Sequence, residues 1–273
     1  MSSGLFYNLV MPVDNDLYNR QAGTWWEEDS FLSNLRVSVN PVRVKYIEAV
    51  LRKSGWDKNG LRVLDVGSGG GYLPEELTRF FDQVCGVDMS PGSVAAAHTH
   101  ALTNGLKIAY RVGRAESLPF ADSAFDVVTC CDVLEHVDDL DRVLAEVARV
   151  LKPGGIFVYD TINRTFMTWL AVIFVAQEFP LTRFFPAKTH DWRMFIRPKE
   201  LTAALSRQGI VNQDRRGMSS EVNPLCNFWL LLMMKSGRLS YREYSLRSRL
   251  HLSHNTIMNY IGHGVLEDDP HKN

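Results

Sequence analysis

The amino-acid sequence predicts an α/β fold, built on a doubly wound and mostly parallel sheet. Two observations lead to this prediction. Short apolar runs of strand length alternate with helix-compatible segments between residues 61 and 161, and a glycine-rich turn directly follows the first run. A strand that connects through a helix to the next strand gives a parallel pair, so repetition of this unit gives a parallel sheet.

The expected elements follow one another in a regular order. Five strands are expected, with the ranges 61–66, 84–88, 108–112, 125–131 and 156–161. The helices between them are expected at 72–81, 93–105 and 140–151. A further helix is expected from Pro198 to near Gly209, because proline favours the start of a helix and glycine its end. With the strands that follow it, we expect seven strands in all.

Four segments are expected in the chain. Residues 1–58 would form an N-terminal helical lid, and residues 59–162 the ligand-binding core. Residues 163–198 are rich in aromatic, aliphatic and basic side chains, which indicates an inserted cap. Residues 199–266 would complete the core and carry an apolar insertion at 225–252. Within it, residues 225–234 are almost wholly apolar, and both a buried strand and an interfacial helix fit them.

Composition narrows the class of protein. The chain has 273 residues, 45% of them hydrophobic, and a formal net charge of −1. These values favour one globular domain, and the charge gives no indication of nucleic-acid binding. No secretion signal is expected at the N-terminus. A cytoplasmic location is expected, because neither a zinc spacing nor a disulfide framework joins the four cysteines, Cys85, Cys130, Cys131 and Cys226.

The glycine-rich turn indicates the ligand. It reads DVGSGGG from Asp65 to Gly71, at the carboxyl end of the first strand, where open α/β sheets bind nucleotides. An aspartate before the first glycine would repel a pyrophosphate, but it suits a ligand that carries an ammonium group. Asp88 ends the second strand and can accept hydrogen bonds from both ribose hydroxyls. Together these features indicate S-adenosylmethionine as the cofactor, with a nicotinamide dinucleotide as the alternative.

Further motifs support a resemblance to a known family. They are NPVR at 40–43, FDVVTCCDVLEHV at 125–137, LKPGG at 151–155, THD at 189–191 and FIRP at 195–198. With the glycine turn, they resemble the class I S-adenosylmethionine-dependent methyltransferases, and among these the ubiquinone-biosynthesis O-methyltransferase family. The resemblance runs from about residue 18 to residue 223 and implies a Rossmann-like core.

The resemblance and the turn together give candidate binding residues. The candidate cofactor-binding residues are Arg43, Asp65, Gly67, Ser68, Gly69, Asp88, Met89, Ala115, Glu116 and Cys131. Arg43 would reach the methionyl carboxylate, and Glu116 or backbone groups near it would recognise adenine. The candidate substrate residues are Trp25, Trp26, Asn163, Trp169 and His190.

Asp132, Glu135 and His136 follow the fourth strand at a spacing that puts them on one face of a helical turn. Three interpretations remain open. The side chains could bind Mg²⁺, Mn²⁺ or Zn²⁺, which the resemblance implies as a holder of a catechol-type acceptor. His136 could act without a metal as the general base, with Glu135 as a second catalytic group. Alternatively, Asp132 caps a helix while Glu135 and His136 form a buried pair.

The sequence therefore predicts methyl transfer from S-adenosylmethionine to a hydroxyl of an apolar aromatic acceptor, for example a prenylated one. A second hypothesis is methylation of carbon or nitrogen in a terpenoid or polyketide, which the insertion at 225–252 favours. A third is a cofactor-binding partner subunit without turnover. Residues 163–193 set cations beside aromatic side chains, which fits both a lid over the pocket and a peripheral contact with a membrane. The oligomeric state is not indicated.

Overall fold

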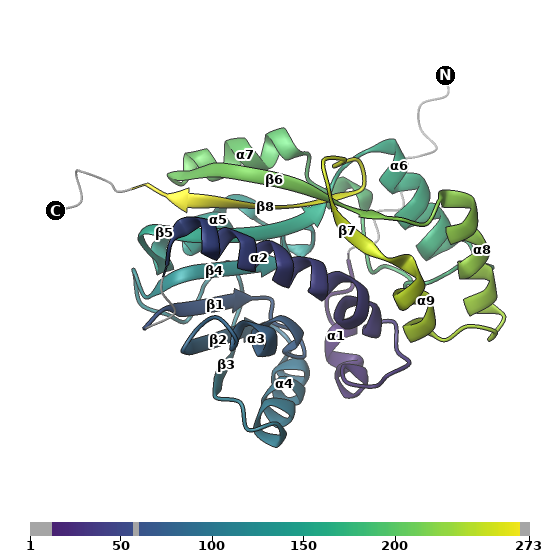
Figure 1. The fold of residues 1–273 in the computed structure, drawn as a ribbon, viewed down its shortest axis with the longest axis horizontal. Helices are drawn as coiled ribbons and strands as arrows, with labels where there is room; N and C mark the ends of the chain where they lie inside the picture. The colour runs from purple at the N-terminus through teal and green to yellow at the C-terminus, as the bar shows by residue number, and fades with distance from the viewer. Residues whose placement is uncertain (1–12, 57–59, 268–273) are drawn as a thin grey trace.

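The computed structural model describes residues 13–56 and 60–267, so the ends of the predicted lid segment, 1–12 and 57–58, lie outside the described residues. An eight-stranded sheet runs through the molecule in the order β3-β2-β1-β4-β5-β8-β6-β7 (Figure 1). The first five strands in this order pair in parallel, and β8 joins β5 in the antiparallel direction. The predicted α/β fold with a mostly parallel sheet is confirmed.

The strands are β1 (Arg62–Val66), β2 (Gln83–Asp88), β3 (Ile108–Val112), β4 (Phe125–Cys131), β5 (Leu151–Ile162), β6 (Ile210–Ser220), β7 (Leu250–Ser253) and β8 (Asn259–Leu266). The α-helices are α1 (Leu17–Arg20), α2 (Asn40–Ser54), α3 (Tyr72–Leu77), α4 (Pro91–Thr103), α5 (Leu140–Val150), α6 (Phe166–Thr168), α7 (Pro198–Arg207), α8 (Pro224–Lys235) and α9 (Tyr241–Ser248). Shorter or wider helical turns are η1 (Ala22–Thr24), η2 (Leu35–Val39), η3 (Leu134–His136), η4 (Trp169–Glu178) and η5 (Trp192–Met194).

Helices cover both faces of the sheet. On one face α2 and α3 pack over alternate strand residues such as Val63 and Val127, and on the other α5 and α7 pack over their neighbours Leu64 and Val128. This alternation is the period of two that a strand imposes on its side chains. Because helices bury both faces of the sheet, a ligand can reach it beyond the carboxyl ends of the parallel strands.

Helix α5 illustrates how the sequence specifies these layers. Asp139 caps the helix by accepting a hydrogen bond from the N–H of Arg142, which satisfies one of the free donors of the first turn. The buried side chains of α5 recur at helical spacing, and they are Val143, Leu144, Val147 and Val150. The helix therefore presents one apolar stripe to the sheet and its charged residues to solvent.

The sheet has eight strands where seven were predicted. The additional strand β7 forms because β6 continues to Ser220, three residues beyond its last pairing with β8 at Gly217, and Gly217 to Ser220 pair with Leu250 to Ser253. The insertion at 225–252 is therefore two helices and the start of an edge strand. The stretch 225–234 that was left open lies in helix α8.

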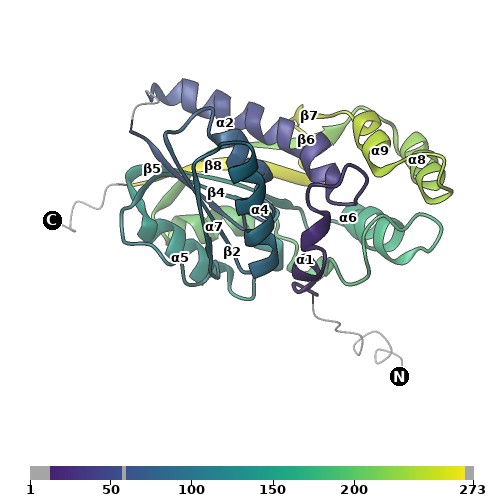
Figure 2. The ribbon, with the colours of Figure 1, turned by 90° about the horizontal axis from the view of Figure 1, so that it is seen from below.

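The cap and the C-terminal insertion share a small core of their own. Phe184 from the cap is buried with Leu231, Met234 and Leu239. Figures 1 and 2 both show α6, α8 and α9 at one end of the molecule, remote from the last described strand residues of β8. Within residues 13–56 and 60–267, none of the helices has the length and apolar content that crossing a membrane requires.

Candidate active site

The glycine turn between β1 and α3 is shaped by close contacts. Gly67 has φ +75°, and a Cβ added there would lie 2.1 Å from Cγ2 of Val133. Only glycine adopts this conformation without strain and leaves room for that neighbour. Gly71, with φ +91°, precedes α3 as its N-cap residue. The turn thus brings backbone to the carboxyl edge of the sheet without side chains that would fill it.

Asp88 lies beside this turn at the end of β2. Its two carboxylate oxygens accept hydrogen bonds from the N–H groups of Gly69 and Ser90, each at 2.8 Å. Burial raises the pKa of Asp88, and these two hydrogen bonds oppose that shift. Each carboxylate oxygen has a further lone pair, so the side chain is held in place with acceptor capacity left for a ligand's hydroxyls.

A pocket at the carboxyl ends of β1, β2, β3 and β4, here called the sheet-edge pocket, encloses about 650 Å³ including its open mouth. Five predicted cofactor-binding residues line it, namely Gly67, Asp88, Met89, Ala115 and Glu116. Asp132 and His136 also line it, as do Asn15 and Tyr18 from the N-terminal segment.

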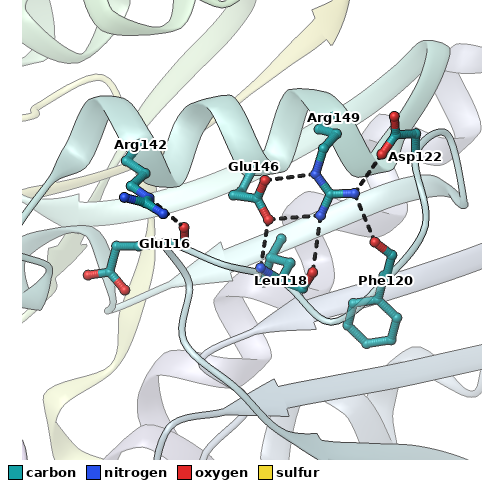
Figure 3. A network of polar contacts seen from close by, with 7 residues as sticks. All are labelled: Glu116, Leu118, Phe120, Asp122, Arg142, Glu146 and Arg149. Atoms are coloured by element: carbon teal, nitrogen blue, oxygen red, sulfur yellow. Dashed lines mark hydrogen bonds and ion pairs between the residues drawn. The ribbon is translucent and has the colours of Figure 1, made fainter.

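The loop that carries Ala115 and Glu116 is fixed to helix α5 (Figure 3). Arg149 donates to the carbonyls of Leu118 and Phe120 and to the carboxylates of Asp122 and Glu146. Glu146 in turn accepts the N–H of Leu118 at 2.7 Å, and Arg142 donates to the carbonyl of Glu116 at 3.0 Å. The wall of the sheet-edge pocket is therefore held at its backbone, which preorganises it for a ligand.

A second pocket, here called the cap pocket, meets the first at Tyr18 and Asp132. It encloses about 890 Å³ including its mouth, and most of its lining is apolar. Its walls come from segments that are distant in the sequence: the N-terminal lid, the cap, the end of β5 at Ile162 and the starts of β7 and β8 at Leu250 and Asn259. Apolar side chains from these segments include Phe31, Leu35, Ile162, Val172, Phe184, Phe185 and Leu250.

Two histidines lie where the pockets meet. His136 lines the sheet-edge pocket and His190 lines the cap pocket, with their ring centroids 5.3 Å apart. Burial lowers the pKa of His136 to about 4 and that of His190 to about 3, so both imidazoles are neutral near pH 7. The Nδ1 atom of each ring is buried without a hydrogen-bond partner. A neutral imidazole with a free nitrogen is equipped to accept a proton or a hydroxyl hydrogen.

Beneath the pockets, the buried side chain of Arg43 forms ion pairs with two carboxylates. Its guanidinium donates to Asp160 through Nε at 2.6 Å and Nη2 at 3.0 Å, and it also pairs with Asp132. Burial raises the pKa of Asp132, but the ion pair with Arg43 outweighs this and holds the pKa below its usual value. Arg43 therefore organises carboxylates in this structure, and the predicted contact with a methionyl carboxylate would require it to share or exchange these partners.

Two more buried carboxyls surround this ion pair. Burial raises the pKa of Asp65 to about 7, although the hydroxyl of Thr129 donates to it at 2.5 Å. Burial and the neighbouring charge of Asp132 raise the pKa of Glu135 to about 8, and the Thr161 hydroxyl donates to it at 2.8 Å. Glu135 is only 1% exposed, so it supports the site from below and holds a proton at neutral pH.

The predicted metal site does not fit the structure. Asp132, Glu135 and His136 are not on one helical turn, because Asp132 has φ +53° and η3 spans only Leu134–His136. Asp132 is paired with Arg43, and Glu135 with Thr161. Among the residues that the structure describes, no group of three or more His, Cys, Asp or Glu side chains is arranged to hold a metal ion.

The other predicted residues lie around the pockets. Trp25 packs across Gly69 and Gly70 and donates to the hydroxyl of Ser93 at 2.9 Å. Trp26 donates to the carbonyl of Gly70 and stacks on His100. Both tryptophans thus hold the lid on the glycine turn.

The remaining candidates have mainly structural contacts. Asn163 donates to the carbonyl of Thr256, and Trp169 is 40% exposed on the outside of the cap. Ser68 is buried in the turn, and its hydroxyl has no partner there. Cys131 is buried at the end of β4, where burial raises the pKa of its thiol, so it is not a reactive thiolate.

Sequence reasoning missed three contributors. Asn15 and Tyr18 precede every recognised motif, and no signal in the sequence relates them to the pocket. Asp160 was within reach, because it lies two residues before the end of β5, just as Asp65 and Asp88 lie next to or at the ends of their own strands. A carboxylate at that place in a parallel sheet indicates the ligand edge.

Comparisons with known proteins identify the family of the chain. Residues 64–159 match a family model described as "Methyltransferase domain". The ubiquinone biosynthesis O-methyltransferase of Xanthomonas axonopodis pv. citri is 35% identical over 251 residues, which are 92% of each chain. Its counterpart from Sinorhizobium fredii is 36% identical over 223 residues, covering 79% of this chain and 88% of that one.

A solved structure shows the same fold at lower identity. Magnesium protoporphyrin IX methyltransferase from Synechocystis, solved with bound SAH, superposes with a TM-score of 0.60 at 19% identity and covers 92% of this chain and 97% of its own. The fold and the site thus define an S-adenosylmethionine-dependent methyltransferase. The chain belongs to the ubiquinone biosynthesis O-methyltransferase family.

Proposed function

We propose that this enzyme methylates a hydroxyl group of an apolar aromatic acceptor, such as a prenylated dihydroxybenzene. The observation that supports this best is the apolar cap pocket, which meets the sheet-edge pocket at Tyr18 and Asp132. An adenosyl cofactor in the sheet-edge pocket would direct its methyl group toward an acceptor ring in the cap pocket. The names of the relatives, which refer to ubiquinone biosynthesis, agree with an acceptor of this class.

The cofactor supplies a methyl group on a sulfonium, which is a good leaving group. The residues of the chain have to bind the cofactor, orient the acceptor and take the proton from its hydroxyl group. Asp88 would accept hydrogen bonds from the ribose hydroxyls, and Gly67 would let the ligand lie against backbone. The charge-assisted bonds of Asp88 are the larger contribution, because a carboxylate acceptor roughly doubles the strength of a hydrogen bond.

His136 is the proposed general base. As the acceptor oxygen forms its bond to the methyl carbon, the acceptor O–H bond breaks and its proton moves to the imidazole. His136 lines the sheet-edge pocket and its imidazole is neutral near pH 7, so one of its two ring nitrogens can accept a proton. Glu135, by contrast, would act through the position of η3, since it lies below the pocket and bonds to Thr161. No step is assigned to a metal ion.

The second candidate function is methylation of carbon or nitrogen in a terpenoid or polyketide. One observation favours it: Leu250, from the insertion predicted at 225–252, lines the cap pocket. An insertion that changes the acceptor wall can change the acceptor. The nucleophilic atom then decides between the two candidates.

A matched series of dihydroxybenzenes with zero to several prenyl units tests both candidates. Each prenyl unit buried in the cap pocket contributes about 25 cal/mol per Å² of apolar surface, so kcat/KM should rise with tail length. Product is measured by mass spectrometry, and the methylated atom is located. Equal kcat/KM across the series would contradict the apolar acceptor, and transfer to carbon or nitrogen would favour the second candidate.

Residues 163–193 are proposed as a lid that also contacts a membrane surface. Five large apolar side chains of this segment are exposed, namely Phe166, Met167, Trp169, Phe174 and Leu181. Trp169 stacks between Phe166 and Phe174, which gives an aromatic ridge. Trp169→Ala should reduce the advantage of long-tailed acceptors presented in vesicles.

A further inference from the structure

A further pocket, here called the β6 pocket, opens on the face of the sheet on which α2 packs. It encloses about 880 Å³ including its mouth. Its walls come from α2, from the strands β6, β7 and β8, and from the residue that follows β7 (Figure 1). None of the described residues that line it also lines the sheet-edge pocket or the cap pocket. A ligand in the β6 pocket would therefore bind outside the active site, and its binding does not depend on the acceptor.

Two buried polar side chains, Tyr46 of α2 and His263 of β8, line this pocket. Tyr46 is 3% exposed and His263 9%. The Tyr46 hydroxyl lies 2.9 Å from Nδ1 of His263, whereas Nε2 has no hydrogen-bond partner among residues 13–56 and 60–267. The tyrosine hydroxyl can donate to Nδ1, which leaves the imidazole proton on Nε2. Because buried polar groups nearly always have a partner, an N–H at Nε2 is suited to a ligand in the pocket.

Positive charge exceeds negative charge around the pocket. Arg216 of β6 donates from Nε to Asp214 at 3.1 Å and from Nη1 to the ring of His254 at 2.9 Å, and a guanidinium has five N–H donors in all. Asp214 is the only carboxylate among the described lining residues, and Arg216 balances its charge. Lys53 also lines the pocket, and no ion pair joins it to another described side chain. The charge of Lys53 therefore remains for a ligand.

Part of the wall is apolar, and the combination with these charges specifies a class of ligand. Val50 of α2 and Leu252 of β7 line the pocket. Guanidinium and ammonium groups bind carboxylates and phosphates through charge-assisted hydrogen bonds. We propose that the β6 pocket binds a small organic anion. Its carboxylate or phosphate group would contact Lys53, Arg216 and Nε2 of His263, and its apolar part would pack against Val50 and Leu252.

Calorimetry on the full chain tests the proposal, with S-adenosylhomocysteine present at saturation. The probes are benzoate and phenyl phosphate, which differ in the charged group, and benzyl alcohol, which has a similar ring and no charge. We expect at least one of the two anions to bind at least tenfold more tightly than benzyl alcohol. Added salt should weaken the binding of that anion. The anion that binds more tightly identifies the charged group that the pocket prefers.

Variants locate the binding, because an aromatic probe also fits an apolar pocket such as the cap pocket. Lys53→Glu and Arg216→Gln should each weaken the binding of the preferred anion by roughly tenfold or more. The matched control is Lys45→Glu, at an exposed lysine of the same helix that does not line the β6 pocket. It should leave anion binding unchanged. Equal affinity for S-adenosylhomocysteine shows that each variant folds.

Three results would overturn the proposal. The first is that neither anion binds the wild type. The second is that benzyl alcohol binds as tightly as both anions, because the pocket would then not recognise the charge. The third is that folded Lys53→Glu and Arg216→Gln variants bind the preferred anion as tightly as the wild type, because the anion would then lie elsewhere on the protein.

Discussion

Replacing Glu135 by glutamine should make the stability of the enzyme less sensitive to pH. Glu135 is buried, and its pKa rises from 4.5 to about 8 because of burial and the charge of Asp132. Below pH 4.5 both the folded and the unfolded chain hold this proton, and no cost arises. As the pH rises toward 8, the unfolded chain loses the proton while the folded chain retains it, so the free energy of unfolding falls.

The size of this effect follows from the shift. One pKa unit corresponds to about 1.4 kcal/mol, so Glu135 should lower the free energy of unfolding by about 3 kcal/mol between pH 4.5 and pH 7. Glutamine retains an oxygen that can accept the hydroxyl of Thr161, and it has no proton to lose in this range. The Glu135→Gln variant should therefore lack this part of the decline, whatever its absolute stability at a single pH.

Urea unfolding at several pH values between 5 and 8, without cofactor, measures the difference. Glu28→Gln is the matched control, because Glu28 is an exposed glutamate of the lid. Parallel pH dependence of the wild type and Glu135→Gln would refute the argument that the buried carboxyl is protonated. The same variant separates two roles of Glu135. If Glu135 only positions other groups, the Glu135→Gln enzyme should keep most of its kcat. If Glu135 is a catalytic carboxyl or a metal ligand, the variant should lose most of its kcat.

Three further predictions concern the pocket. Asp88→Ala should weaken S-adenosylmethionine binding in calorimetry by about 1.5–3 kcal/mol for each charge-assisted bond lost, and unchanged affinity in a folded variant would exclude the ribose contact. His136→Ala should lower kcat. The wild-type rate should not fall with acid near pH 6.5, because the imidazole is protonated only as the pH falls through about 4. A fall in rate at pH 6.5 would contradict the burial of the base. Arg149→Met should lower the free energy of unfolding by about 2 kcal/mol and raise the KM for the cofactor, because the loop with Ala115 and Glu116 loses its attachment to α5. An unchanged KM would show that the loop keeps its conformation without Arg149.

The sequence predicted the core strands well because their signals are local. The ranges expected at 108–112 and 125–131 coincide with β3 and β4. The start of β5 was placed five residues late, because Lys152 to Gly155 read as a breaker. In the structure Leu151 already pairs with Phe125, and the register shifts before the pairing resumes at Ile156. A pairing partner therefore overrode a local turn signal.

The apolar run of helix α8 fits both a strand and a helix, although the start of the helix carries a signal. The side chain of Asn223 accepts the N–H of Cys226, and Pro224 takes the first helical position. Asparagine followed by proline is a typical helix start. The length of the apolar run, in contrast, fits both a strand and a helix. Strand β7 gave no comparable signal, because it is short and exists only where the extended β6 offers it an edge.

The cofactor edge was predictable for the same reason as the strands, whereas the acceptor side was not. Gly67 directly follows β1 and Asp88 ends β2, and parallel strands bring their carboxyl ends together. The cap pocket is assembled from segments more than a hundred residues apart, such as Phe31 and Phe185, and no periodicity relates them. Asp132 was expected on a helical turn, but its backbone has a positive φ and its carboxylate turns toward Arg43.

The buried charges suggest why a sulfonium ligand suits this site. Arg43 neutralises one of the two carboxylates it contacts, Asp132 and Asp160, so one negative charge remains beneath the pockets. Asp65, with its pKa raised to about 7, adds part of another. Such charge is costly in a buried site unless a cation approaches, and S-adenosylmethionine brings both an ammonium and a sulfonium. Its binding would lower the pKa of Asp65. Once the methyl group has left, the sulfur is an uncharged thioether, and its attraction to the carboxylates is lost. Carboxylates that attract the cofactor before transfer would therefore attract S-adenosylhomocysteine less strongly after it.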